Sequence, residues 1–128
     1  MVYVFFVGRL LLGGFFLWMG IQHLRNLESM SGYAASQGVP APKIATAGSG
    51  VLLMTGGASV VTGLAPLVGI VALTAFLVPV TLKMHAFWTI DDPQARSMHT
   101  TQFLKNVALL GATLLLVAVQ QPWPLSLS

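Results

Sequence analysis

Five residues that can form hydrogen bonds lie within or at the edges of long apolar stretches. They are His23, His85, Gln102, Lys105 and Asn106. Polar side chains in such stretches are costly to place in lipid, and they usually face protein or water. If the stretches are helices that alternate across a membrane, all five gather near one face, where imidazole and ammonium or amide groups can bond the two carbonyls of a quinone head group. The alternative is structural: lysines that reach lipid phosphates and polar residues that tie helix ends together.

Other chemistry has less support in the sequence. Haem ligation by His23 and His85 lacks any accompanying cofactor motif. Three scattered histidines are a weak basis for a metal site, so we assign no metal ligands and no catalytic residues, and we expect no catalytic activity of the chain's own. Cysteine is absent, which excludes thiol chemistry and iron–sulfur ligation by this chain. The three acidic residues are all expected in polar connections, which argues against transport coupled through a buried carboxylate.

The composition is that of a membrane protein. Of the 128 residues, 55% are hydrophobic and 7% are charged, against about 25% charged in soluble domains. Stretches of about 20 apolar residues are long enough to cross a bilayer. We therefore predict an all-α integral membrane protein, a bundle of four transmembrane helices forming a single domain over residues 1–128. The predicted spans are about 2–24, 43–64, 66–89 and 101–119. The first lacks a signal-peptide pattern, so we expect it to be retained.

The connections carry signals of their own. Residues 25–42 are polar with one apolar edge, which allows a short helix lying on the membrane surface. Residues 91–97 are predicted to form a polar loop, with Ser97 or Thr100 capping the fourth span. Trp123 is expected to anchor the chain at the membrane interface.

Small residues indicate where the helices touch. One stripe of the first span holds Arg9, Gly13, Phe16, Gly20 and His23, and we interpret Arg9 as an anchor that reaches the membrane surface. The second span is predicted to be the most buried, because small residues let helix backbones approach closely. A proline in the third span removes one helical hydrogen bond and favours a kink. The predicted packing positions are Gly13, Gly20, Gly56, Gly57, Gly63 and Pro79.

The distribution of positive charge predicts the orientation. Arg25, Lys43, Lys83, Arg96 and Lys105 belong to the side of the two longer connections, and the amino-terminal side has one arginine. The positive-inside rule then places both longer connections in the cytoplasm and both termini outside. A net charge of +3 is too small and scattered to indicate nucleic acid. The expected partners are the lipid bilayer and other membrane protein subunits.

Several short motifs together point to a known family. They are Arg9-Leu10-Leu11-Leu12-Gly13, Gly20-Ile21-Gln22, Gly38-Val39-Pro40, Gly56-Gly57 with Gly63, His85-Ala86-Phe87-Trp88, and, as the most specific, Gln102-Phe103-Leu104-Lys105-Asn106-Val107-Ala108-Leu109-Leu110-Gly111. Over about residues 7–118, the chain resembles the DoxX family of small four-helix bacterial membrane proteins. It departs from the family at His23, where many members have lysine, and at Leu53, where many have glutamate, so a buried acid is missing.

The resemblance implies a link to redox metabolism. The family takes its name from a subunit associated with a terminal quinol oxidase, and it resembles parts of thiosulfate:quinone oxidoreductases and redox-stress complexes. It therefore implies a redox-associated accessory subunit in the bacterial inner membrane. The charge distribution makes the termini of such a subunit periplasmic, and the polar residues of the loop-side face make quinone a candidate ligand there. The alternative is a structural or assembly subunit of a larger membrane complex, without ligand chemistry.

Overall fold

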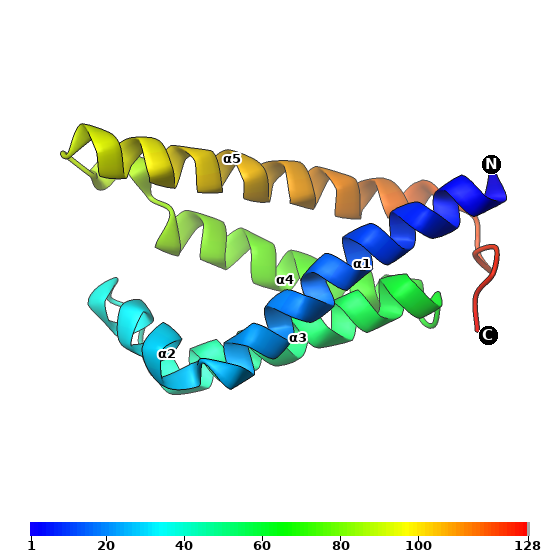
Figure 1. Cartoon of the computed structure of the whole chain (residues 1–128), viewed down its shortest axis with the longest axis horizontal. Coiled ribbons are helices and arrows are strands. Elements are labelled where there is room, and N and C mark those ends of the chain that lie inside the picture. The colour runs from blue at the N-terminus through cyan, green and yellow to red at the C-terminus, as the bar shows by residue number, and fades with distance from the viewer. Residues whose placement is uncertain (128) are drawn as a thin grey trace.

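Four long helices and one short helix make up the chain, described here over residues 1–127 of a computed structural model. The helices are α1 (Val2–Arg25), α2 (Leu27–Ser36), α3 (Pro42–Thr62), α4 (Pro66–Met84) and α5 (Pro93–Leu115), with 3₁₀ turns at Phe87–Thr89 and Leu116–Ala118 (Figure 1). The spans that contain α1, α3, α4 and α5 are long and apolar enough to cross a membrane. The predicted all-α bundle of four membrane helices is confirmed, and the first connection does contain a short helix.

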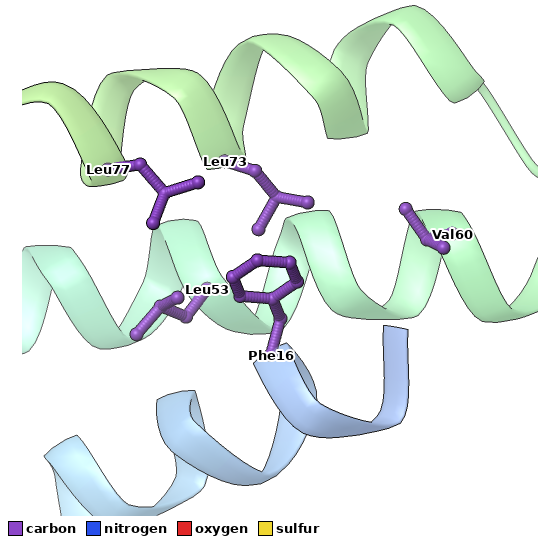
Figure 2. Close-up of a cluster of buried hydrophobic side chains, with 5 residues drawn as sticks. All are labelled: Phe16, Leu53, Val60, Leu73 and Leu77. Carbon is purple, nitrogen blue, oxygen red and sulfur yellow. The ribbon is translucent and has the colours of Figure 1, made fainter. Parts of the chain in front are cut away.

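The long helices pack in the order α1, α3, α4, α5, so that α3 lies between α1 and α4. Both termini lie at one end of the bundle; α2 and the α4–α5 connection lie at the other, which we call the loop end (Figure 1). An apolar core forms where α1, α3 and α4 meet (Figure 2). Its fully buried members are Phe16, Leu53, Val60, Leu73 and Leu77.

Helices α1 and α3 approach each other through glycine. A Cβ added at Gly13 would lie 2.8 Å from the carbonyl oxygen of Gly57, and one at Gly20 would lie 2.7 Å from that of Gly50. Side chains cannot fit between backbones this close, which is the role of small residues in membrane bundles. The predicted stripe on α1 is confirmed, because its buried residues are Arg9, Gly13, Phe16, Gly20 and His23.

The other side of α3 packs on α4. A Cβ at Gly56 would collide with the side chain of Leu73, and Gly69 of α4 lies against Ser59. Gly63 ends α3 in the left-handed conformation, with φ at 78°, as glycine commonly does at a helix C-terminus. The most apolar windows of α3 and α4 are buried to the same extent. The prediction that α3 alone is the most buried helix is therefore wrong.

Helix α5 begins two turns earlier than the sequence predicted. Asp92, not Ser97 or Thr100, is the N-cap, and its Oδ2 accepts a hydrogen bond from the Ala95 amide at 2.9 Å. Pro93 takes the first helical position, where no amide hydrogen is needed. The predicted loop at 91–97 is therefore wrong. The first residues of α5 are polar, so hydropathy excluded them from the predicted span although they are helical.

Helix α4 ends earlier than predicted, at Met84, and His85 follows as its C-cap. The chain then turns so that Phe87 and Trp88 stack edge-to-face on Phe103 of α5, with ring centroids 5.2 and 5.8 Å away. The predicted span to residue 89 is therefore not one continuous α-helix. His85 lies at the corner between α4 and α5.

Arg9 does not reach for the membrane surface, so its interpretation as a surface anchor is wrong. Its side chain is 1% exposed. Nε and Nη2 donate to the carbonyls of Val60 and Val61 at 3.0 and 2.9 Å, and Nη1 donates to Pro124. The carbonyls in the last turn of α3 lack helical partners and attract a cation. Trp123, expected at the interface, is instead 2% exposed, and its ring lies 5.5 Å from the guanidinium.

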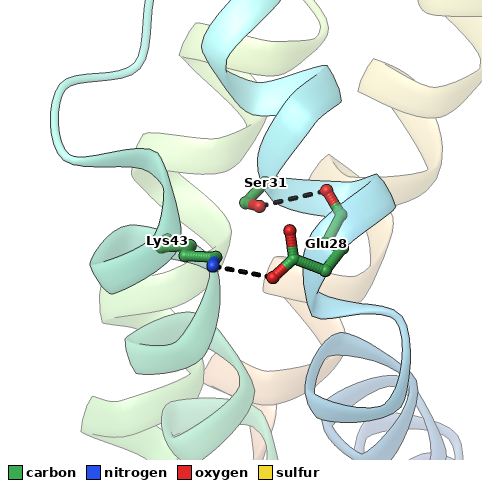
Figure 3. A network of polar contacts seen from close by, with 3 residues as sticks. All are labelled: Glu28, Ser31 and Lys43. Carbon is green, nitrogen blue, oxygen red and sulfur yellow. Dashed lines mark hydrogen bonds and ion pairs between the residues drawn. The ribbon is translucent and has the colours of Figure 1, made fainter.

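Helix α2 is attached to α3 through one polar contact at the loop end. Lys43 Nζ lies 2.7 Å from Glu28 Oε1, and the Ser31 hydroxyl donates to the Glu28 carbonyl oxygen at 3.1 Å (Figure 3). Both charged side chains are largely exposed, so the pair contributes at most about 1 kcal/mol. Burial of Ser31 and Ala34 shows that α2 turns one side toward the bundle.

Candidate ligand cavity

A cavity of about 710 Å³ occupies the loop-end half of the bundle. All five helices contribute to its wall, and most of its lining is apolar. Ligand pockets in proteins have this size and character, with a few polar groups that fix orientation. The core residues Phe16, Leu53 and Leu77 line it together with Leu109 of α5.

The five residues predicted as ligand contacts are brought together around this cavity. They are His23 from α1, His85 at the end of α4, and Gln102, Lys105 and Asn106 from α5. Because α5 starts at Pro93, Lys105 and Asn106 lie in the middle of that helix and not at its loop end, where the sequence placed them. The polar groups therefore extend from the mouth of the cavity into its interior. Binding of a ligand by these residues stays a prediction.

Asn106 is a polar residue of the cavity wall whose side chain lacks hydrogen-bond partners. It is 7% exposed, yet within residues 1–127 its carboxamide makes no hydrogen bond, and no side-chain nitrogen or oxygen there is both fully enclosed and unpaired. The amide atoms are therefore reachable from the cavity, which Asn106 lines. An amide that opens into an apolar cavity needs a water molecule or a ligand to supply its hydrogen bonds.

The His23 ring is held in place by its own helix. Its Nδ1 donates to the Met19 carbonyl oxygen at 2.8 Å, which leaves Nε2 of a neutral ring as an acceptor. The ring also stacks edge-to-face on Phe76, with centroids 5.8 Å apart. His23 therefore offers a fixed imidazole at the cavity wall.

His85 is paired with His99, a contact that the sequence analysis did not predict. The two Nδ1 atoms lie 3.3 Å apart, so one ring donates and the other accepts. His99 lies about one turn before Gln102 and two turns before Asn106, on the polar first part of α5. A longer helix with its cap at Asp92 would have placed His99 opposite His85, and the Asp92-Pro93 pair was the signal for it.

Two further contributors to the wall were missed. Lys83, which the sequence analysis used only for orientation, lines the cavity from the last turn of α4. Met30 and Tyr33 of α2 line its rim, whereas the apolar edge of this segment was expected to rest on the membrane. No three His, Asp or Glu side chains of the described chain are grouped closely enough to hold a metal ion.

The predicted packing positions fall into two groups. Gly13, Gly20, Gly56 and Gly57 lie in close helix contacts and Gly63 lies at the α3 C-cap, all outside the cavity. Pro79 is instead an exposed residue of the cavity wall, inside a helix that continues through it.

A family comparison agrees with this architecture. The model of the DoxX family matches residues 4–86, well over half of the chain. The chain belongs to the DoxX family. The DoxX match covers α1 to α4 and includes His23 and His85, but it ends before α5. The block from Gln102 to Gly111, which carried most weight in the resemblance, therefore lies outside the matched region. No curated protein and no solved structure matches this DoxX chain.

Proposed function

We propose that this protein is an accessory subunit of a respiratory or redox complex in the bacterial inner membrane, and that its loop-end cavity holds the head group of an amphiphile, with quinone as the first candidate. The observation that carries the proposal is the unpartnered carboxamide of Asn106, 7% exposed, on the wall of a cavity of about 710 Å³. A head-group oxygen would satisfy this amide. His23, His85 and Gln102 provide further hydrogen-bonding groups around the same space.

A structural subunit without ligand chemistry is the second candidate. Helix α5 favours it, because the most apolar window of α5 is the least buried of the four. Its exposed apolar residues include Leu104, Val107, Leu114 and Leu115. Such a surface suits lipid or a neighbouring subunit equally well. A substitution at the cavity separates the two candidates.

His85→Phe is expected to lower quinone retention by about tenfold while the protein stays folded, because the ring keeps its bulk but loses its hydrogen bonds at the cavity. The measurement is quinone co-extracted with protein purified in mild detergent, together with the melting temperature of the same sample. Arg96→Gln is the matched control, since Arg96 is exposed and outside the cavity. Unchanged retention with a lower melting temperature would instead support the structural subunit.

We also propose that the loop end faces the cytoplasm and that both termini face the periplasm. Both termini lie at the same end in Figure 1, and four of the six lysines and arginines (Arg25, Lys43, Lys83 and Arg96) lie at or near the other end, as the positive-inside rule requires. The chain has no cysteine, so Ser97→Cys and Gln120→Cys, both at exposed positions, each give a single label site. In intact cells an impermeant maleimide should label position 120 and leave position 97 unlabelled. The reverse pattern would invert the topology.

A further inference from the structure

The polar part of the cavity wall carries positive charge and no negative charge. Lys83 and Lys105 line the cavity with His23 and His85, and none of its lining residues is aspartate or glutamate. Both lysines are exposed, so the cavity opens to the outside of the bundle at these residues.

The acidic residues of the chain are engaged elsewhere. Glu28 pairs with Lys43 at 2.7 Å, Asp92 caps α5, and Asp91 is exposed in the same connection. Among residues 1–127, the Glu28–Lys43 pair is the one ion pair between side chains. Neither lysine of the cavity therefore has a carboxylate partner within the described chain.

The ammonium group of Lys105 points across the cavity and not toward the loop end. Its Nζ lies 5.9 Å from the ring centroid of Phe15 on α1. Phe15 precedes the end of α1 at Arg25 by ten residues, which corresponds to about 15 Å of helix. A lysine that reached for lipid phosphate would extend the other way, toward the membrane surface. This cation instead sits at depth with an aromatic face as its contact, a weaker partner than an anion.

The apolar residues and Asn106 of the cavity wall indicate which other groups the ligand carries. Phe16, Leu53 and Leu77 form the apolar wall of the cavity, so a hydrocarbon chain can be accommodated beside the charged groups. Asn106 offers an amide donor next to Lys105 in the sequence and on the same wall. A neutral quinone carbonyl would satisfy the amide but leave the Lys105 ammonium without a counter-ion.

We infer that the cavity takes an amphiphile with an anionic head group, a carboxylate or a phosphate, and that Lys105 is its counter-ion. The inference rests on the proposed function, since it specifies the ligand class of the same cavity. The head group lies beside the Lys105 ammonium, between α5 and Phe15 of α1, and the hydrocarbon chain lies along the apolar wall between α1, α3 and α4.

The test compares ligands that share a hydrocarbon chain. Oleate, oleoyl lysophosphatidic acid and oleyl alcohol are titrated into the purified full chain in a non-ionic detergent, with inorganic phosphate and decylubiquinone as further arms. The two anionic amphiphiles should bind at least about tenfold more tightly than the alcohol, as charge-assisted hydrogen bonds exceed neutral ones in strength. Lys105→Gln should remove most of this preference, Lys105→Arg should restore it, and Arg96→Gln should leave it unchanged.

Each result has a distinct meaning. The tighter of oleate and lysophosphatidic acid identifies carboxylate or phosphate as the head group. If inorganic phosphate binds as tightly as lysophosphatidic acid, the hydrocarbon chain contributes nothing and the proposal that the ligand is an amphiphile is wrong. Equal affinity for oleate and oleyl alcohol, or a preference that persists in Lys105→Gln, would overturn the anionic head group; decylubiquinone binding in the same experiment would then leave the proposed function standing. Failure of every ligand, decylubiquinone included, would overturn both.

Discussion

Replacing Arg9 with methionine is expected to lower the free energy of unfolding by about 3 kcal/mol or more, because each buried acceptor that loses its partner costs about 1–3 kcal/mol. The guanidinium donates to the carbonyls of Val60, Val61 and Pro124. Methionine preserves much of the volume but offers no donor. The carbonyls at the end of α3 would then remain unpaired in a buried place, and the carboxyl-terminal segment would lose its attachment to α1.

The measurement is unfolding in mixed micelles with increasing denaturing detergent. Arg25→Met is the matched control, because Arg25 is an exposed arginine on the same helix and should shift the midpoint little. A second variant, Trp123→Ala, tests the same cluster from the other side, since Trp123 packs on Arg9 and on Phe5. If Arg9→Met unfolds at the same midpoint as Arg25→Met, the cluster does not hold the terminal segment.

Periodicity is the reason why so much of the fold could be predicted. The stripe on α1 follows directly from a repeat of 3.6 residues, and the five positions it selects are those that the structure buries. Alternation of helices across a membrane brings the C-terminal ends of α1 and α4 and the N-terminal end of α5 to the same side. That rule predicted that His23, His85 and Asn106 gather near one face, and in the structure all three line one cavity.

Hydropathy could not set the start of α5, because it marks where a helix enters lipid and not where the helix begins. The cap at Asp92 and the proline after it start the helix in a polar stretch. This difference of two turns brings His99 beside His85 and moves Lys105 to the middle of its helix. The charged part of the cavity is therefore deeper than the sequence suggested.

Contacts between distant residues account for the remaining differences. Arg9 and Pro124 are separated by 115 positions, and no local pattern connects an arginine in the first span to a carbonyl near the end of the chain. On local information a lone arginine near the start of a span is an anchor. Its actual role depends on the end of α3, where unpaired carbonyls attract a cation.

Gly57→Ala is expected to destabilise the protein by about 1–3 kcal/mol, the usual cost of overpacking, although it adds a single methyl group. A Cβ at this position would lie 2.5 Å from the Leu17 amide nitrogen and 2.6 Å from the Gly13 carbonyl oxygen. Both are backbone atoms of α1, which cannot turn aside as a side chain can, so the two helices must move apart along their whole contact. Gly57→Leu should prevent the bundle from forming.

Gly48 supplies the matched control on the same helix, because nothing lies within 4 Å of a Cβ built there. Gly48→Ala should leave stability unchanged or raise it by up to about 1 kcal/mol, since glycine inside a helix is less favourable than alanine. In the same detergent, Gly57→Ala should therefore unfold at a lower midpoint than Gly48→Ala. The difference between the two midpoints reports the free-energy cost of a methyl group at the close α1–α3 contact. Midpoints that shift in the same direction and by the same amount would mean that helix propensity governs both sites and that α1 and α3 are not in backbone contact at Gly57.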